Sequence, residues 1–191
     1  MVLGMRSRYY IISLFTLLFF CSTEIDYGIN KREKKLNNFL AKSYKPITLV
    51  KEEIVIPDSL LIYEENKAYK LSTSGDSLLG FLLFNRALGC RVGGCSADGG
   101  SKSGDNQDPY YFATIYNADF SIREINVLEY YSEYGVEITS RRWLKQFANK
   151  VVCGMDLKEK IDGISGATIS VNSLLAEVKW NCNLTNYLSS L

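Results

Sequence analysis

The sequence has 191 residues, of which 47% are hydrophobic and 23% are charged, a composition typical of one globular domain. Its formal net charge of +1 gives no electrostatic basis for nucleic-acid binding, so no nucleic-acid partner is expected. The absence of histidine excludes a Ser-His-Asp triad, a Cys-His pair and any imidazole metal site.

The first residues are typical of an export signal. Two arginines within residues 1–8 precede an uninterrupted run, YYIISLFTLLFF, at residues 9–20. As a helix this run spans only about 18 Å, too short for a hydrocarbon core of about 30 Å. A basic start followed by a short apolar run indicates export. Residues 1–21 are therefore predicted to be an export signal, with an uncleaved anchor as the alternative.

Cys21 directly follows the apolar run and resembles the lipidated cysteine of bacterial lipoproteins. Lipidation there would hold an extracytoplasmic protein at the membrane surface. Residues 22–45 are rich in lysine and arginine and carry apolar residues at helical spacing, which predicts a helix or a tether. Residues 46–191 are predicted to form the folded domain.

The first half of this domain reads as strands and a loop. Strands are predicted at residues 47–57, as two short pieces within residues 60–71, and at residues 78–88. Residues 96–109 contain no apolar side chain beyond Ala97 and predict a disordered surface loop. The aspartates of this loop lack the alternating spacing of a calcium site, so no metal is predicted.

The second half begins with a clear hairpin. Its strands are predicted at residues 110–116 and 122–129, with a turn at residues 117–119. The WLKQF segment at residues 143–147 presents one helical face, and apolar spacing from Val171 predicts an amphipathic C-terminal helix. Together these elements predict an α+β fold, with an antiparallel sheet and a hairpin core packed against helices.

The C-terminal helix is preceded by a glycine-rich stretch, DGISGATIS, at residues 162–170. Small residues let a ligand approach the backbone, and a helix start offers free N–H groups to an anion. An ordinary helix cap by Ser165 or Thr168 is the alternative, but it does not explain the neighbouring glycines and alanine. Seven residues are candidates for cofactor binding: Asp162, Gly163, Ile164, Ser165, Gly166, Ala167 and Thr168.

From Tyr110 to about Leu188 the chain resembles the FMN-binding domain of the covalent flavoproteins, such as the periplasmic flavin subunits of the Rnf and Na+-translocating NADH:quinone oxidoreductase complexes. The family signature is Asp, two spacers, Ser or Thr, Gly, Ala, then Thr or Ser, and residues 162–168 match it throughout. The resemblance implies that Thr168 carries FMN through a phosphoester, placed there by a separate FMN transferase.

The resemblance also implies which residues border the flavin. A glycine loop at EYGVEI, residues 133–138, places Gly135 and Tyr134 among the candidates, although it departs from the Glu-Thr-Pro-Gly form of well-known members. Trp143 and Phe147 are candidates to line the isoalloxazine ring, with a plain core role as the alternative.

Besides Cys21 there are four cysteines, an even number that suggests disulfides in an exported chain. The glycines of GCRVGGC would let Cys90 and Cys95 approach each other, and Cys153 and Cys182 could form a second bridge. For Cys90 and Cys95 a structural disulfide, a redox-active pair and a metal site stay open.

These features predict a membrane-associated extracytoplasmic flavoprotein that shuttles electrons between membrane redox proteins. Since no side chain resembles a substrate acid or base, a non-catalytic carrier is favoured over an enzyme. The alternative is an FMN-dependent reductase or thiol–disulfide enzyme that uses Cys90 and Cys95.

Overall fold

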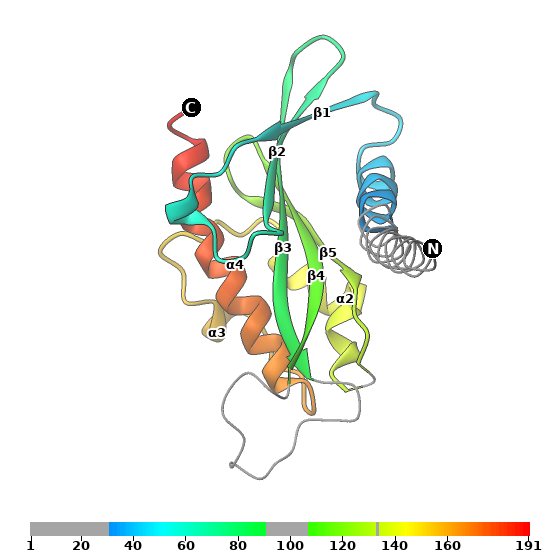
Figure 1. Cartoon of the computed structure of the whole chain (residues 1–191), viewed down its shortest axis with the longest axis vertical. Helices are drawn as coiled ribbons and strands as arrows, with labels where there is room; N and C mark the ends of the chain where they lie inside the picture. The colour runs from blue at the N-terminus through cyan, green and yellow to red at the C-terminus, as the bar shows by residue number, and fades with distance from the viewer. Residues whose placement is uncertain (1–30, 91–106, 133) are drawn as a thin grey trace, which may run out of the picture. The chain divides into compact units, whose positions relative to one another are not determined.

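The computed structural model describes residues 31–90, 107–132 and 134–191 (Figure 1). The chain divides into two compact units, residues 1–38 and residues 39–191. Residues 31–43 are helical. The export signal, Cys21 and Cys95 lie outside the described residues.

The larger unit is built on one five-stranded antiparallel sheet, whose strands lie in chain order. The strands are β1 (Leu49–Ile54), β2 (Lys67–Thr73), β3 (Leu78–Cys90), β4 (Gln107–Asn117) and β5 (Ile122–Glu129). The predicted α+β fold with an antiparallel sheet is confirmed. The predicted hairpin is β4–β5, with Thr114 opposite Ile125 and the turn closed by a bond from Asn117 N–H to the Ser121 carbonyl.

Short helices connect the strands, and one long helix follows them. The short elements are η1 (Asp58–Leu60), η2 (Val136–Thr139), α2 (Arg141–Leu144), η3 (Lys145–Phe147) and α3 (Leu157–Lys160). The long helix is α4 (Thr168–Leu188), which packs along β3, whereas α2 and η3 pack against β5 (Figure 1). The predicted amphipathic face of α4 is its buried face, which includes Leu174 and Val178.

The core lies between the middle of the sheet and these helices. β3 and β4 are buried over most of their length because apolar and aromatic side chains line both strands. Tyr110, Phe112 and Ile122 are fully or almost fully buried and belong to the same cluster as Leu174 of α4. Removing such side chains from water supplies most of the stabilisation of a fold of this size. The start of α4 is thereby fixed against the ends of β3 and β4.

Two predictions about local structure are wrong. Of the two short strands predicted within residues 60–71, only the second is present, as part of β2; bends and a turn at residues 62–65 replace the first, and Asn66 holds this turn to the sheet. Its side chain accepts a hydrogen bond from Arg86 N–H at 2.9 Å, and its N–H donates to Tyr63. The last residues of the predicted loop, 107–109, instead belong to β4 and pair with Leu88, Gly89 and Cys90, and the rest of the predicted loop lies outside the described residues.

None of the helices within the described ranges combines the length and the apolar character that a membrane span requires.

Candidate functional site

The glycine-rich stretch forms a turn that leads into α4. Gly166 has a left-handed backbone, with φ of +82°, which favours glycine. The Ala167 N–H donates to the Ile164 carbonyl at 3.1 Å, and Val171 N–H donates to the Ala167 carbonyl at 2.9 Å. This second bond is the first of the helix, so the preceding N–H groups lack an acceptor within α4. Ala167 occupies the cap position and no side chain caps the helix. Neither Ser165 nor Thr168 is therefore a helix cap, and this alternative is wrong.

The surface of this turn is open. Ser165, Gly166 and Thr168 are exposed, whereas Ala167 is fully buried and anchors the turn in the core. A Cβ placed on Gly163 or Gly166 would meet no atom within 4 Å. The turn therefore presents the hydroxyl of Thr168, on the first residue of a long helix, beside unoccupied space. The N–H groups and the positive end of the helix dipole favour a negatively charged group at this position.

The WLKQF segment holds the turn through the backbone of Asp162. The Trp143 indole N–H donates to the Asp162 carbonyl at 2.7 Å, and the Asp162 N–H donates to the Gln146 side-chain oxygen at 2.9 Å. The carboxylate of Asp162 is left exposed. Sequence reasoning did not single out Gln146, although it lies within the WLKQF pattern.

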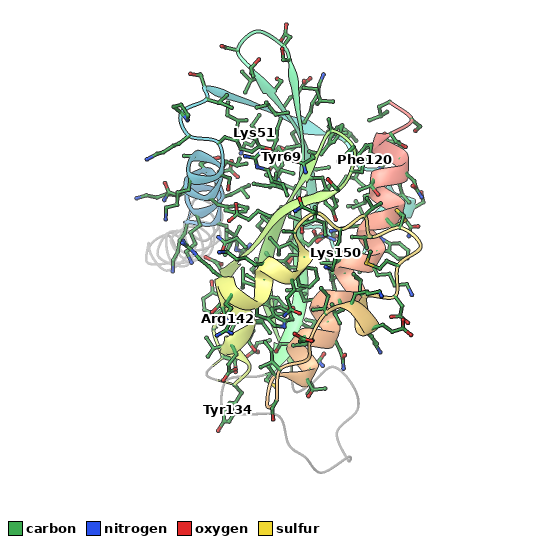
Figure 2. All side chains as sticks on the ribbon, turned by 180° about the vertical axis from the view of Figure 1, so that it is seen from behind. Lys51, Tyr69, Phe120, Tyr134, Arg142 and Lys150 are labelled. Atoms are coloured by element: carbon green, nitrogen blue, oxygen red, sulfur yellow. A yellow bond between two sulfur atoms is a disulfide. The ribbon has the colours of Figure 1, made fainter. Side chains whose placement is uncertain are left out.

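Trp143 and Phe147 are part of the hydrophobic core. Trp143 is 7% exposed and Phe147 is fully buried, and their rings pack edge to face with centroids 5.5 Å apart. Their role in the structure is to position the turn, and contact with a flavin ring stays a prediction for both. Tyr134, by contrast, is half-exposed at the end of the domain, where its side chain points outward (Figure 2).

The glycine loop lies against the first turn of α4. Gly135 has a φ of +79°, and a Cβ there would lie 2.8 Å from the Tyr130 hydroxyl and 2.9 Å from Ser170 Oγ. A Cβ on Gly89 would also come close to the same two hydroxyls, at 3.1 Å from that of Tyr130 and 3.2 Å from Ser170 Oγ. The structure therefore brings Gly135 close to the predicted site, and the close approach requires glycine.

A hydroxyl network that sequence reasoning missed holds these parts together. Tyr130 donates its single proton to the Tyr134 carbonyl at 2.5 Å, so Ser170 Oγ is the donor in the 2.7 Å contact with Tyr130. The Tyr110 hydroxyl donates to the Ser170 carbonyl at 2.9 Å. Burial, with a smaller contribution from Tyr130, raises the pKa of Tyr110 well above its usual value, which keeps this donor protonated.

A fourth bond joins α4 directly to the sheet, from Leu88 N–H to Ser173 Oγ at 2.9 Å. The only sequence signal for these contacts was the position of Ser170 within DGISGATIS. Their partners come from β3, from β4 and from the loop after β5, segments that no local pattern connects.

The cysteines fall into two groups. Cys153 and Cys182 form a disulfide, with an S–S distance of 2.10 Å, that joins the segment before α3 to the later part of α4. This is the second bridge that the cysteine count had suggested. Cys90 is buried at the end of β3, opposite Gln107 and next to Gly89. Its pairing with Cys95 stays a prediction because Cys95 lies outside the described residues.

One family model matches the part of the chain that contains this site. Residues 104–179 match the family model described as the FMN-binding domain. The match contains β4, β5, the glycine loop, the WLKQF segment and the start of α4 with its glycine-rich turn. No curated protein matches the chain.

Proposed function

From the match of residues 104–179 to the FMN-binding domain family, we propose that this protein binds flavin, carries FMN covalently on Thr168 and passes electrons between redox partners outside the cytoplasm. The family makes FMN the expected cofactor. The attachment residue, the electron-carrier role and the location are the proposal.

The observation that carries the proposal is the setting of Thr168. Its side chain is exposed on the first residue of α4, beside a turn in which Gly163 and Gly166 leave open space. Esterification would join Thr168 Oγ1 to the FMN phosphorus with the net loss of one water. The phosphate oxygens would then face the N–H groups of the helix start and its positive dipole end.

The remaining parts of the site would orient the cofactor. Bound FMN would supply the redox chemistry, accepting and releasing electrons, while the protein sets its orientation and exposure. Trp143 and Gln146 fix the turn that bears Thr168, and the Tyr130–Ser170 pair fixes the glycine loop beside it. Tyr134 and Gly135 would border the flavin from that loop.

The expected location and partners follow from features beyond the site. A disulfide such as Cys153–Cys182 persists in oxidising compartments, which agrees with export by the signal at residues 1–21. Lipidation of Cys21 would keep the protein at the membrane surface. The proposed partners are an FMN transferase that loads the cofactor and membrane redox proteins that donate or accept electrons.

The test is the intact mass of the chain after co-expression with an FMN transferase. Wild-type protein should gain one FMN less one water, and Thr168→Ala should gain nothing. Ser189→Ala is the matched control, because it removes an exposed hydroxyl at the other end of the same helix, outside the signature, and should still be loaded. Trypsin should place the adduct on the peptide Ile161–Lys179, in which fragmentation separates Thr168 from the other hydroxyls. An unmodified wild-type chain in the presence of an active transferase would refute covalent attachment.

A second candidate function rests on the position of Cys90. It follows Gly89, which lies against Ser170 near the start of α4, so a thiol or disulfide at Cys90 would lie at the same end of the domain as Thr168. In that case the protein would be an FMN-dependent reductase or thiol–disulfide enzyme that uses Cys90 and Cys95. Replacing both cysteines by serine should spare flavin loading and electron acceptance in a carrier but abolish turnover in an enzyme.

A further inference from the structure

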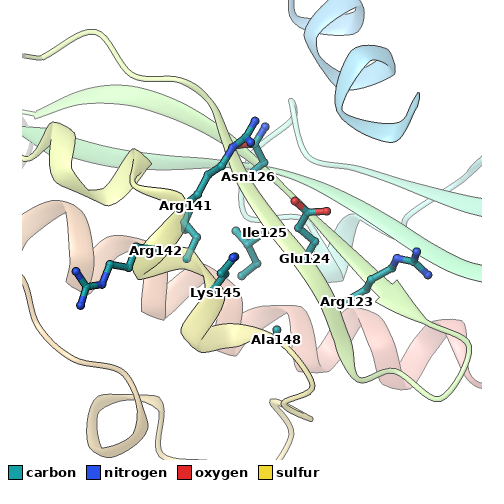
Figure 3. A pocket seen from close by; sticks show the side chains of 9 residues that line it. Arg123, Glu124, Ile125, Asn126, Arg141, Arg142, Lys145 and Ala148 are labelled. Atoms are coloured by element: carbon teal, nitrogen blue, oxygen red, sulfur yellow. The ribbon is translucent and has the colours of Figure 1, made fainter. Parts of the chain in front are cut away.

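A basic concavity of about 350 Å³ lies between β5 and the segment formed by α2 and η3 (Figure 3). Arg141 and Lys145 stand on the helical wall, and Glu124 and Asn126 stand on the facing strand. Arg142 and Arg123 extend outward from its two ends. We call these six residues and the space they enclose the basic pocket.

The positive charge of the basic pocket is largely uncompensated. Across the described residues, Arg141, Arg142 and Lys145 form no ion pair. The one carboxylate of the pocket, Glu124, accepts a hydrogen bond from Ser43 Oγ at 2.7 Å. Arg123 donates to the Ser43 carbonyl at 3.0 Å and lies over the Tyr44 ring at 4.5 Å. Arg141, Lys145 and Arg142 are thus available to pair with negative charges of a bound ligand.

The floor of the basic pocket is apolar. Ile125 and Leu144 contribute to its lining, and they are only 4% and 3% exposed. A cationic rim around an apolar floor has the composition of a protein–protein contact, in which arginine is enriched and the centre excludes water. A ligand suited to it would carry carboxylates around an aliphatic or aromatic side chain.

The same short segment forms both the basic pocket and the support of the Thr168 turn. Arg141 and Lys145 stand on the wall of the basic pocket, while Trp143 and Gln146 of the same segment bind the backbone of Asp162. A helix with its side chains is about 10 Å across. A partner seated in the basic pocket would therefore lie about one helix thickness from the glycine-rich turn.

We propose that the basic pocket is the docking surface for an acidic segment of a partner protein. Complementary charge would speed the encounter and set its orientation, and it would leave the contact weak enough to dissociate quickly. The identification of that partner as a redox protein rests on the proposed function. The binding itself does not, since no residue of the basic pocket belongs to the glycine-rich turn.

An acidic protein segment fits better than an anionic membrane surface. A membrane attracts a broad, uniformly basic face, whereas this surface is concave and keeps Glu124 among its cations. A mixed pattern of one carboxylate among several cations discriminates between partners through like-charge repulsion. The membrane is therefore the alternative outcome of the test.

The test uses the full chain without flavin and a fluorescent peptide in which glutamates alternate with leucines. Fluorescence anisotropy should give saturable binding with a Kd below about 1 mM near 0.02 M salt, weakened several-fold at about 0.15 M. The double variant Arg141→Glu/Lys145→Glu should bind at least about tenfold more weakly. The double variant Lys158→Glu/Lys179→Glu makes the same change in net charge on exposed residues outside the basic pocket and should bind as wild type.

Three results would overturn the proposal. One is the absence of saturable binding, and another is an equal loss in the two double variants, which would indicate a general charge effect. The third is binding to vesicles of equal parts phosphatidylcholine and phosphatidylglycerol without binding to the peptide, which would assign the surface to lipid. Because the chain carries no flavin in this experiment, its outcome is independent of whether Thr168 is the attachment residue.

Discussion

The first residue of α4 and its later turns have opposite surroundings. Thr168 is exposed next to open space, whereas Leu174, Val178 and Asn181 are fully buried against the sheet. The later turns also carry the Cys153–Cys182 disulfide. One helix thus combines an accessible end with a body that is fixed on several sides.

This difference indicates how the fold supports a site on a helix end. Precise placement of a ligand requires rigid supporting elements, and an accessible hydroxyl requires the absence of covering side chains. Here the rigidity comes from the buried residues beside Thr168, Ala167 and Ser170, and from the later turns of α4. Disturbing the body of α4 should therefore cost stability, and disturbing its first turn should cost function.

The largest expected effect comes from removing the disulfide. The bridge links cysteines 29 residues apart, and for a loop of this length its loss costs about 3 to 4 kcal/mol of unfolding free energy. Urea unfolding of Cys153→Ser/Cys182→Ser should show this decrease, and wild type treated with a reductant should match the variant. A loss below about 1 kcal/mol would mean that packing alone fixes the later turns.

The next effect is a pH dependence at Glu177, which is buried in the middle of α4 with one carboxylate oxygen lacking a hydrogen bond within the described residues. Burial raises the pKa of Glu177 from 4.5 to about 7, and the facing groups are Tyr63 and Tyr110. Because the folded pKa is the higher one, the protonated form stabilises the fold below pH 4.5. That stability, at most about 3 kcal/mol, is lost as the pH rises to about 7.

Glu177→Gln should remove this pH dependence. The variant should gain stability over wild type progressively between pH 4.5 and pH 7, as followed by urea unfolding at several pH values. Glu159→Gln, at an exposed position, is the control and should leave the pH profile unchanged. Parallel pH profiles for wild type and Glu177→Gln would contradict the expectation.

A buried amide pair offers a third test of the body of α4. Asn85 and Asn181 are fully buried and exchange two hydrogen bonds, at 3.0 and 3.1 Å. Asn85→Leu should cost about 2 kcal/mol because it leaves a buried amide without its partner. The double variant Asn85→Leu/Asn181→Leu should cost less than the sum of the single variants, since both polar groups are then gone. Additive losses would show that the two amides act independently.

Trp143→Phe tests the support of the glycine-rich turn. It removes the bond to the Asp162 carbonyl and should cost about 1 kcal/mol, with faster hydrogen exchange in residues 161–167. Trp180→Phe is the matched control, because its indole N–H donates to the Leu60 carbonyl at 3.2 Å, away from the turn. If hydrogen exchange in residues 161–167 were equally fast in both variants, the bond from Trp143 would not be what supports the turn.

The smallest effect on stability is expected at Thr168 itself. Its exposed side chain caps nothing, so Thr168→Ala should change the unfolding free energy by less than about 0.5 kcal/mol. Thr185→Ala, in the buried part of the same helix, removes a bond to the Cys182 carbonyl at 3.0 Å and should cost about 1 kcal/mol. A larger loss at Thr168 than at Thr185 would invert the comparison between the two parts of α4.

The sequence predicted those parts of the fold whose signal is local. The β4–β5 hairpin was predicted from turn residues between two apolar runs, and α4 from its apolar spacing after a glycine-rich turn. The pieces within residues 60–71 show the limit of this reasoning, because Asn66 found its partner in Arg86 across the sheet. Propensity alone carries no information about such a partner.

The candidate site likewise has a part with a local sequence signal and a part that depends on residues far apart in the sequence. The turn at residues 162–168 is a contiguous motif, which can be read from the sequence alone, and it lies within the family match at residues 104–179. The Tyr130–Ser170 contact joins residues 40 apart, and its members are common residue types at unremarkable spacing. Gln146 and Tyr110 likewise act through single hydrogen bonds to backbone atoms, which leave no pattern in the sequence.

The Cys153–Cys182 bridge has one more consequence, for proteolysis. The residues between the two cysteines include the whole turn and Thr168, so they form a covalently closed loop. A single cut by a protease anywhere in this loop leaves both pieces joined through the disulfide. A cofactor esterified to Thr168 would then stay attached to the nicked protein.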